Sequence, residues 1–164
     1  MKKVTSFFKY RGYGGSLKIN ISTTVFIPKP HTPFQWEPQD SLEEIGRKQQ
    51  LLARELRKVK QIKYSWHGYE MGLLEAVFSR GDRRLSVVIE RAWEKGAKLD
   101  NMSERFSYDI WTEAFRESNI YPSHYANRCI AHHEALPWEH LSSGADKDFL
   151  IKEHEKAFDA ENKI

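Results

Sequence analysis

Apolar residues follow two different spacings along this chain, one typical of strands and one typical of helices. Residues 17–27 are rich in β-branched side chains and alternate between apolar and polar at their start, which predicts a strand. From Leu42 to Val59 apolar residues recur every three or four positions, which predicts an amphipathic helix. A short apolar run over residues 62–66 predicts a second strand. This strand–helix–strand order is typical of an α/β unit.

Polar residues placed before the apolar repeats predict where the helices begin. Ser41 and Glu44 fit a capping box, in which the two side chains satisfy each other's backbone N–H groups. Further helices are predicted to begin at Asp82, Ser107, Pro122 and Asp146, and Gly96 is predicted to end the one that follows Asp82.

The pattern predicts an α+β, mostly helical fold with two structured parts. Residues 17–69 form the strand–helix–strand piece, and residues 70–160 form a bundle of short helices with an irregular stretch over 127–143. Residues 1–16 are expected to be poorly ordered, and residues 161–164 are expected to fray. A single strand–helix–strand piece does not make a stable sheet alone, so the first part is expected to be the end of a larger α/β barrel.

Composition narrows the range of functions. The net charge of +3 is too small to indicate nucleic-acid binding by itself, and no apolar run approaches the length of a membrane span. Cys129 is the one cysteine, so no internal disulfide can form and a cytoplasmic location is expected. One thiol also cannot hold an iron–sulfur cluster or a cysteine-based zinc site.

The most distinctive stretch is the loop 28–36 (PKPHTPFQW), in which three prolines fix the backbone. The loop follows a predicted strand, and in α/β barrels the active site lies beyond the carboxyl ends of the strands. The residues expected to lie near a substrate or cofactor are Lys29, His31, Thr32, Gln35 and Trp36, together with Trp66 and His67 after the second strand. The alternative is a rigid connector that packs its aromatic residues onto the helices.

Two other clusters contain residue types that bind ligands. Arg80, Arg83 and Arg84 surround a turn into a helix and are candidates for binding a phosphate or carboxylate, although a solvated face is the more common outcome for such a cluster. Histidines at 124, 132, 133 and 140 fit no familiar metal-binding spacing, so no metal site is predicted. No residue is assigned a catalytic role.

Several blocks of the sequence resemble one family. Ile21–Trp36 (ISTTVFIPKPHTPFQW) resembles the last barrel strands of radical SAM proteins, and it is most similar to an uncharacterised radical SAM family that has an N-terminal B12-binding domain. The blocks IKYSWH at 62–67, LEAVFSRGDRRL at 74–85, YANR at 125–128 and LPWEH at 136–140 resemble the same family in the same order. The loop 28–36 is also similar to the Pro-x-Pro-Gly-Thr-Pro loop of methylthiotransferases.

The resemblance implies a [4Fe–4S] cluster held by a Cys-x3-Cys-x2-Cys motif, bound S-adenosylmethionine and, through the family's B12-binding domain, cobalamin. This chain lacks that motif, so these cofactors are expected to be bound by other parts of the enzyme. The chain is therefore expected to be the C-terminal segment of a radical SAM enzyme of unknown substrate, inactive alone, with the missing radical SAM core as its partner. It would supply the rim of the barrel and a helical cap. The alternative is a stand-alone helical module that binds RNA through the basic helix 42–60.

Overall fold

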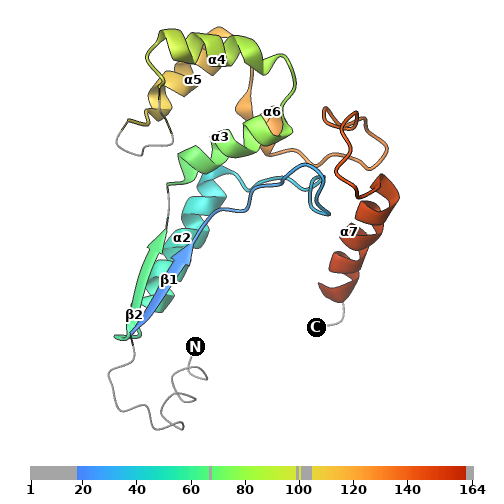
Figure 1. Ribbon diagram of the computed structural model, residues 1–164. Coiled ribbons are helices and arrows are strands. Elements are labelled where there is room, and N and C mark those ends of the chain that lie inside the picture. The colour runs from blue at the N-terminus through green and yellow to red at the C-terminus, as the bar shows by residue number, and fades with distance from the viewer. Residues whose placement is uncertain (1–17, 67, 99, 101–104, 162–164) are drawn as a thin grey trace. The chain divides into compact units, whose positions relative to one another are not determined.

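The computed structural model describes residues 18–66, 68–98, 100 and 105–161, and these divide into two compact units (Figure 1). Unit 1 contains the described residues up to Val25 together with Glu43–Gly68. Unit 2 contains Phe26–Leu42 and the described residues from Tyr69 onward. The expected disorder of residues 1–16 concerns residues outside the described part of the chain. Of the expected frayed tail 161–164, Glu161 is the last residue of helix α7 (Lys147–Glu161), and residues 162–164 lie outside the described part.

Unit 1 is built on two parallel strands joined by a helix. β1 (Ile19–Thr23) pairs in parallel with β2 (Ile62–Trp66), with Ile19 opposite Ile62 and Thr23 opposite Trp66. The chain crosses between the strands through α2 (Leu42–Leu56). The second predicted strand is confirmed, whereas the first ends at Thr23 and not at residue 27.

The helix α2 has the amphipathic character that its sequence predicts. Its first turn carries acidic residues and its last turn carries Arg54, an arrangement that favours the helix dipole. Ile45, Gln49 and Ala53 form its buried stripe, at the three-to-four-residue spacing of one helix face. Leu52, by contrast, is exposed.

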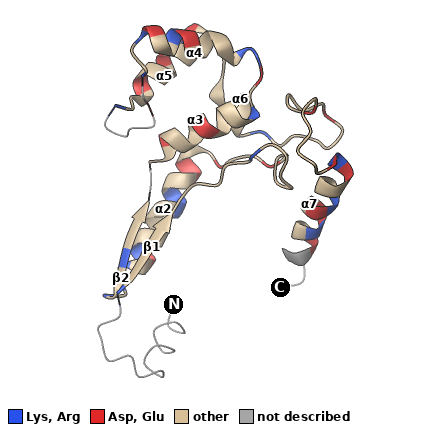
Figure 2. Cartoon of the chain, viewed as in Figure 1, with Lys and Arg blue, Asp and Glu red and all other residues tan. Residues whose placement is uncertain are grey.

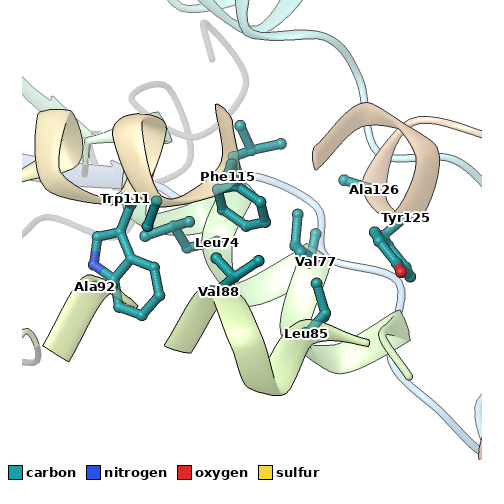
Figure 3. Packing of buried hydrophobic residues seen from close by; sticks show 12 residues of the cluster. Leu74, Val77, Leu85, Val88, Ala92, Trp111, Phe115, Tyr125 and Ala126 are labelled. Carbon is teal, nitrogen blue, oxygen red and sulfur yellow. The ribbon is translucent and has the colours of Figure 1, made fainter. Parts of the chain in front are cut away.

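Unit 2 contains the other five helices of the described residues. They are α3 (Tyr69–Arg80), α4 (Leu85–Glu94), α5 (Tyr108–Glu117), α6 (Pro122–Ala126) and α7 (Lys147–Glu161). α3 packs against α6, and α4 packs against α5. The core between these helices is apolar and includes Leu74, Val77, Val88 and Phe115 (Figure 3). Burying each such side chain contributes about 1.5–3 kcal/mol to stability.

A second apolar cluster ties the proline-rich loop to the C-terminal part of the chain. It consists of Trp36, Ile130, Leu136, Trp138 and Leu150. Loop 28–36, the irregular stretch and α7 therefore share one small core. The loop belongs to unit 2 for this reason, although its sequence position grouped it with the strand–helix–strand piece.

Some helix ends agree with the sequence, and two predicted caps do not form. Ser107 precedes its helix, which begins at Tyr108, as predicted, but its side chain makes no capping hydrogen bond. Asp146 accepts the backbone N–H of Phe149 at 2.7 Å, as expected for the residue before α7. Gly96, just past α4, has a φ of 104°, a conformation that favours glycine. The prediction that Asp82 caps α4 is wrong: the helix begins at Leu85, because the Asp82 carboxylate accepts the N–H of Arg84 at 2.9 Å and forms a turn before the helix.

The mostly helical α+β class is confirmed by these elements. Membership of a radical SAM barrel stays a prediction. Among the described residues, no helix combines the length and the apolar character needed to cross a membrane.

Candidate binding site at the proline-rich loop

The loop 28–36 is held in a tight turn by its own polar groups. The Thr32 hydroxyl donates to the carbonyl of Lys29 at 2.7 Å, and the N–H of Gln35 donates to the carbonyl of Thr32 at 3.1 Å. Between them His31 adopts a φ of 56°, in the left-handed region that non-glycine residues seldom occupy. The turn thus fixes a histidine at the apex of the loop.

Gln35 links this turn to a distant part of the chain. Its side chain is 2% exposed, and its Oε1 accepts two hydrogen bonds, from the N–H of His31 at 3.0 Å and from Nε1 of Trp138 at 2.8 Å. Both partners are donors only, so the oxygen must face them and the amide orientation is fixed. The Nε2 group of Gln35 is therefore directed away from these two partners.

Trp36 has a structural role. It is fully buried, and its carbonyl accepts the N–H of Ile130 at 2.8 Å. Its ring contacts the rings of His132 and His154, with centroids 4.7 Å and 5.6 Å away. Trp36 serves as the centre of the second apolar cluster and is not accessible to a ligand.

Lys29 is directed toward α3. Its ammonium forms an ion pair with Glu75 and donates to the Ser79 hydroxyl at 3.2 Å. Because the Thr32 hydroxyl is also satisfied within the turn, His31 and Gln35 are the two candidates of this loop that line an open space.

That space is a cavity of about 80 Å³ within unit 2. Its polar lining is His31, Gln35, Glu139 and Lys147, and its apolar lining includes Leu136, Leu141, Ala145, Leu150 and Trp138. Lys147 Nζ lies 2.7 Å from Glu139 Oε1. This hydrogen bond is the main cause that lowers the pKa of Glu139, and the N–H of Leu136 adds to it.

Trp138, Glu139 and Lys147 were missed as site residues by sequence reasoning. They lie about a hundred residues from the loop, and no local pattern joins them to it. The one available indication was the Leu-Pro-Trp turn at 136–138, which places an indole in a constrained position.

The two candidates from the second predicted strand and its end, Trp66 and His67, are not part of the loop 28–36. Trp66 belongs to β2 in unit 1, is 44% exposed, and its ring lies 5.2 Å from that of Tyr64. His67 lies outside the described residues.

The three arginines do not converge on one site. Arg80 is 2% exposed and donates to the carbonyls of Ala126 at 3.0 Å and Arg128 at 2.9 Å. Arg84 is exposed and pairs with Asp82 at 2.7 Å, and Arg83 is exposed as well. Because the Arg80 guanidinium already donates to two backbone carbonyls, it cannot bind an anion jointly with Arg83 and Arg84.

His132 and His154 contact each other, although no sequence pattern connects them. His132 Nε2 lies 3.2 Å from His154 Nδ1, and His154 Nε2 lies 2.8 Å from Glu37 Oε1. Among the described residues, no group of three or more His, Cys, Asp or Glu side chains could hold a metal ion. We interpret the pair as an anchor for α7, on which His154 lies.

The basic face of α2 is interleaved with acids (Figure 2). Arg47 and Lys48 lie within 4 Å of Glu44, and Arg54 and Lys58 lie similarly close to Glu55. These pairs reduce the local positive potential that RNA binding through this helix would need. The RNA-binding alternative stays a prediction.

The chemistry that the cavity offers is recognition of a small polar group, since no nucleophile with an adjacent base lies among its lining residues. No protein-family model, curated protein or solved structure matches this chain.

Proposed function

We propose that this chain is the C-terminal part of a radical SAM enzyme, in which it supplies the rim of the barrel and a helical cap. The observation that carries the proposal is the parallel pairing of β1 and β2, which are connected through the proline-rich loop and α2. The ordered sequence blocks from residue 21 to residue 140 support it independently.

A parallel pair of strands is rarely complete by itself. Parallel sheets occur almost only with helices on both faces, and isolated two-stranded sheets are marginal in water. In the described residues each strand pairs with the other alone, and the large ring of Trp66 is 44% exposed. A further parallel strand and a covering layer would bury this surface.

The cofactors of such an enzyme do not fit this chain. A [4Fe–4S] cluster needs several thiolate ligands, and Cys129 is the single cysteine. The proposal therefore assigns the cluster and S-adenosylmethionine to a cluster-bearing core, and cobalamin, where the enzyme uses it, to a further domain. It assigns no chemical step to residues of this chain.

Association with such a core tests the proposal. The tagged 164-residue chain is expressed anaerobically together with the coding region that adjoins its gene, and the purified material is analysed for partner and iron. We expect a Cys-x3-Cys-x2-Cys polypeptide to purify with the chain and to carry about four iron atoms.

Two substitutions test whether the cluster-bearing core binds at β2. Trp66→Arg is expected to reduce the recovered partner at least tenfold, because it places a charge on the exposed part of β2. Trp93→Arg is the matched control, since Trp93 is 59% exposed but lies on α4 in unit 2. A monomeric chain with no partner or iron, and with salt-dependent affinity for RNA, would contradict the proposal and favour the alternative.

A further inference from the structure

The cavity beside the proline-rich loop contains donor groups that the protein leaves unused. With Oε1 of Gln35 fully engaged, its Nε2 group has no hydrogen-bond partner among the described residues, and it is not sealed from solvent. The cavity is the open space that this nearly buried side chain lines. The ring nitrogens of His31 likewise have no partner in the described part of the chain. Because solvent reaches this amide, water can accept its hydrogen bonds, and a ligand acceptor that replaces this water would keep them.

The cavity lining combines N–H donors with an ion pair. Lys147 and Glu139 are paired at 2.7 Å and largely cancel each other's charge. Lys147 keeps further N–H donors beyond the one directed at Glu139. The uncharged Gln35 amide would orient a bound acceptor through a hydrogen bond. The Glu139 carboxylate, held in place by Lys147, disfavours a doubly charged anion such as phosphate.

The size and the apolar wall narrow the ligand further. A volume of about 80 Å³ leaves room for a small group only. Leu136 and Leu150 are almost fully buried and form an apolar side to the cavity. The space suits a carboxylate that carries one or two carbons.

We propose that this cavity is a binding site for a small monocarboxylate, whose oxygens accept hydrogen bonds from Gln35 Nε2 and from His31 or Lys147. The left-handed backbone at His31 is what brings the loop apex to the cavity, a conformation that costs about 1–3 kcal/mol and is often kept for a functional reason. The inference goes beyond the proposed function and rests on unit 2 alone.

The test is an NMR titration of the 164-residue chain with sodium acetate and sodium propionate at constant ionic strength. We expect saturable shifts of the Gln35 side-chain amide and the Trp138 indole N–H, with a millimolar Kd. Inorganic phosphate at the same concentration is expected to give shifts that do not saturate.

Two variants make the result specific. Gln35→Glu retains an acceptor for His31 and Trp138 but removes the free donor, and it should raise the Kd at least tenfold. His31→Gly suits the left-handed backbone and removes the imidazole, so it tests the site even where Gln35→Glu fails to fold. Gln50→Glu adds the same charge on the exposed side of α2 and should leave the Kd unchanged.

The absence of saturable shifts up to 100 mM acetate in the folded chain would overturn the inference. Equal binding of phosphate, or binding unaffected by both cavity variants, would overturn it as well. None of these results depends on a cluster-bearing partner, so the proposed function and this site can fail separately.

Discussion

Arg80 carries a charge into the interior of unit 2. Burial is the main cause that lowers its pKa to about 10, and the nearby Arg128 contributes. The guanidinium therefore stays charged at neutral pH. It donates to the carbonyl of Ala126, the last residue of the short helix α6, and to the carbonyl of Arg128, which follows that helix.

Removing this side chain should destabilise the protein. Arg80→Met removes the donor to the Arg128 carbonyl and one of the two donors to the Ala126 carbonyl, which still accepts the N–H of Gln39 at 2.8 Å. We expect a loss of about 1–3 kcal/mol in the free energy of unfolding. Arg83→Met, on the exposed side of the same turn, should change it by less than about 0.5 kcal/mol. Urea denaturation of both variants measures the difference. Equal effects would show that the buried hydrogen bonds contribute nothing.

Two glycines provide a matched pair for backbone effects. A Cβ at Gly96 or at Gly46 would meet no atom within 4 Å, but Gly96 has a φ of 104° and Gly46 lies within α2. Gly96→Ala is therefore expected to lower the free energy of unfolding by about 1–3 kcal/mol. Gly46→Ala should raise it by about 0.5–1 kcal/mol, because alanine favours the helix. Thermal denaturation should shift in opposite directions, and a shift of the same sign in both would be inconsistent with this account.

At the scale of elements, α7 depends on a few aromatic contacts. His154 lies on α7, with Glu37 and His132 at hydrogen-bonding distance and Phe34 and Phe158 in ring contact. Leu150 adds the apolar contact to the second cluster. The helix carries no other fully buried side chain among its described residues.

Loss of His154 should release α7. In His154→Ala, backbone amides of residues 148–158 are expected to exchange with deuterium at least tenfold faster, while α3 and α4 keep their protection. His140→Ala is the control, because His140 is exposed. Unchanged exchange in α7 would mean that its anchor lies elsewhere.

The strand β2 and the end of helix α4 could be predicted because they depend on residues that are close together in the sequence. The spacing of apolar residues fixes β2 at 62–66, and a glycine just past an apolar repeat marks the end of α4. The contacts that build the cavity are not local: Gln35 and Trp138 are 103 positions apart. The same holds for the pairing of His132 with His154. It also holds for the burial of Arg80, whose carbonyl partners on Ala126 and Arg128 lie 46 and 48 positions away.

At the scale of the whole molecule, ion pairs set the response to acid. Neighbouring cations or backbone N–H groups lower the pKa of several carboxyls below the ordinary values of 4.5 for Glu and 3.8 for Asp; they are Glu44, Glu55, Asp82, Glu117, Glu134 and Glu139. A carboxyl with a lowered pKa stabilises the fold above its ordinary pKa, and that stability is lost as the pH falls through the lowered value.

The urea midpoint should therefore be nearly constant from pH 7 to about pH 5 and should fall below about pH 4.5. High salt should reduce the change, because most of these pairs are exposed. Glu139→Gln removes one contributor and should make the fall shallower. A midpoint that rises on acidification would contradict this balance of charges.

The central claim is that the parallel β1–α2–β2 piece and its loop are the end of a radical SAM barrel. It is tested most directly by sequencing the DNA that precedes the codon of Met1, in every frame. The account predicts a Cys-x3-Cys-x2-Cys coding stretch there, followed by alternating strand and helix patterns that lead into the block at Ile21. Upstream sequence without such a stretch in any frame would contradict the claim.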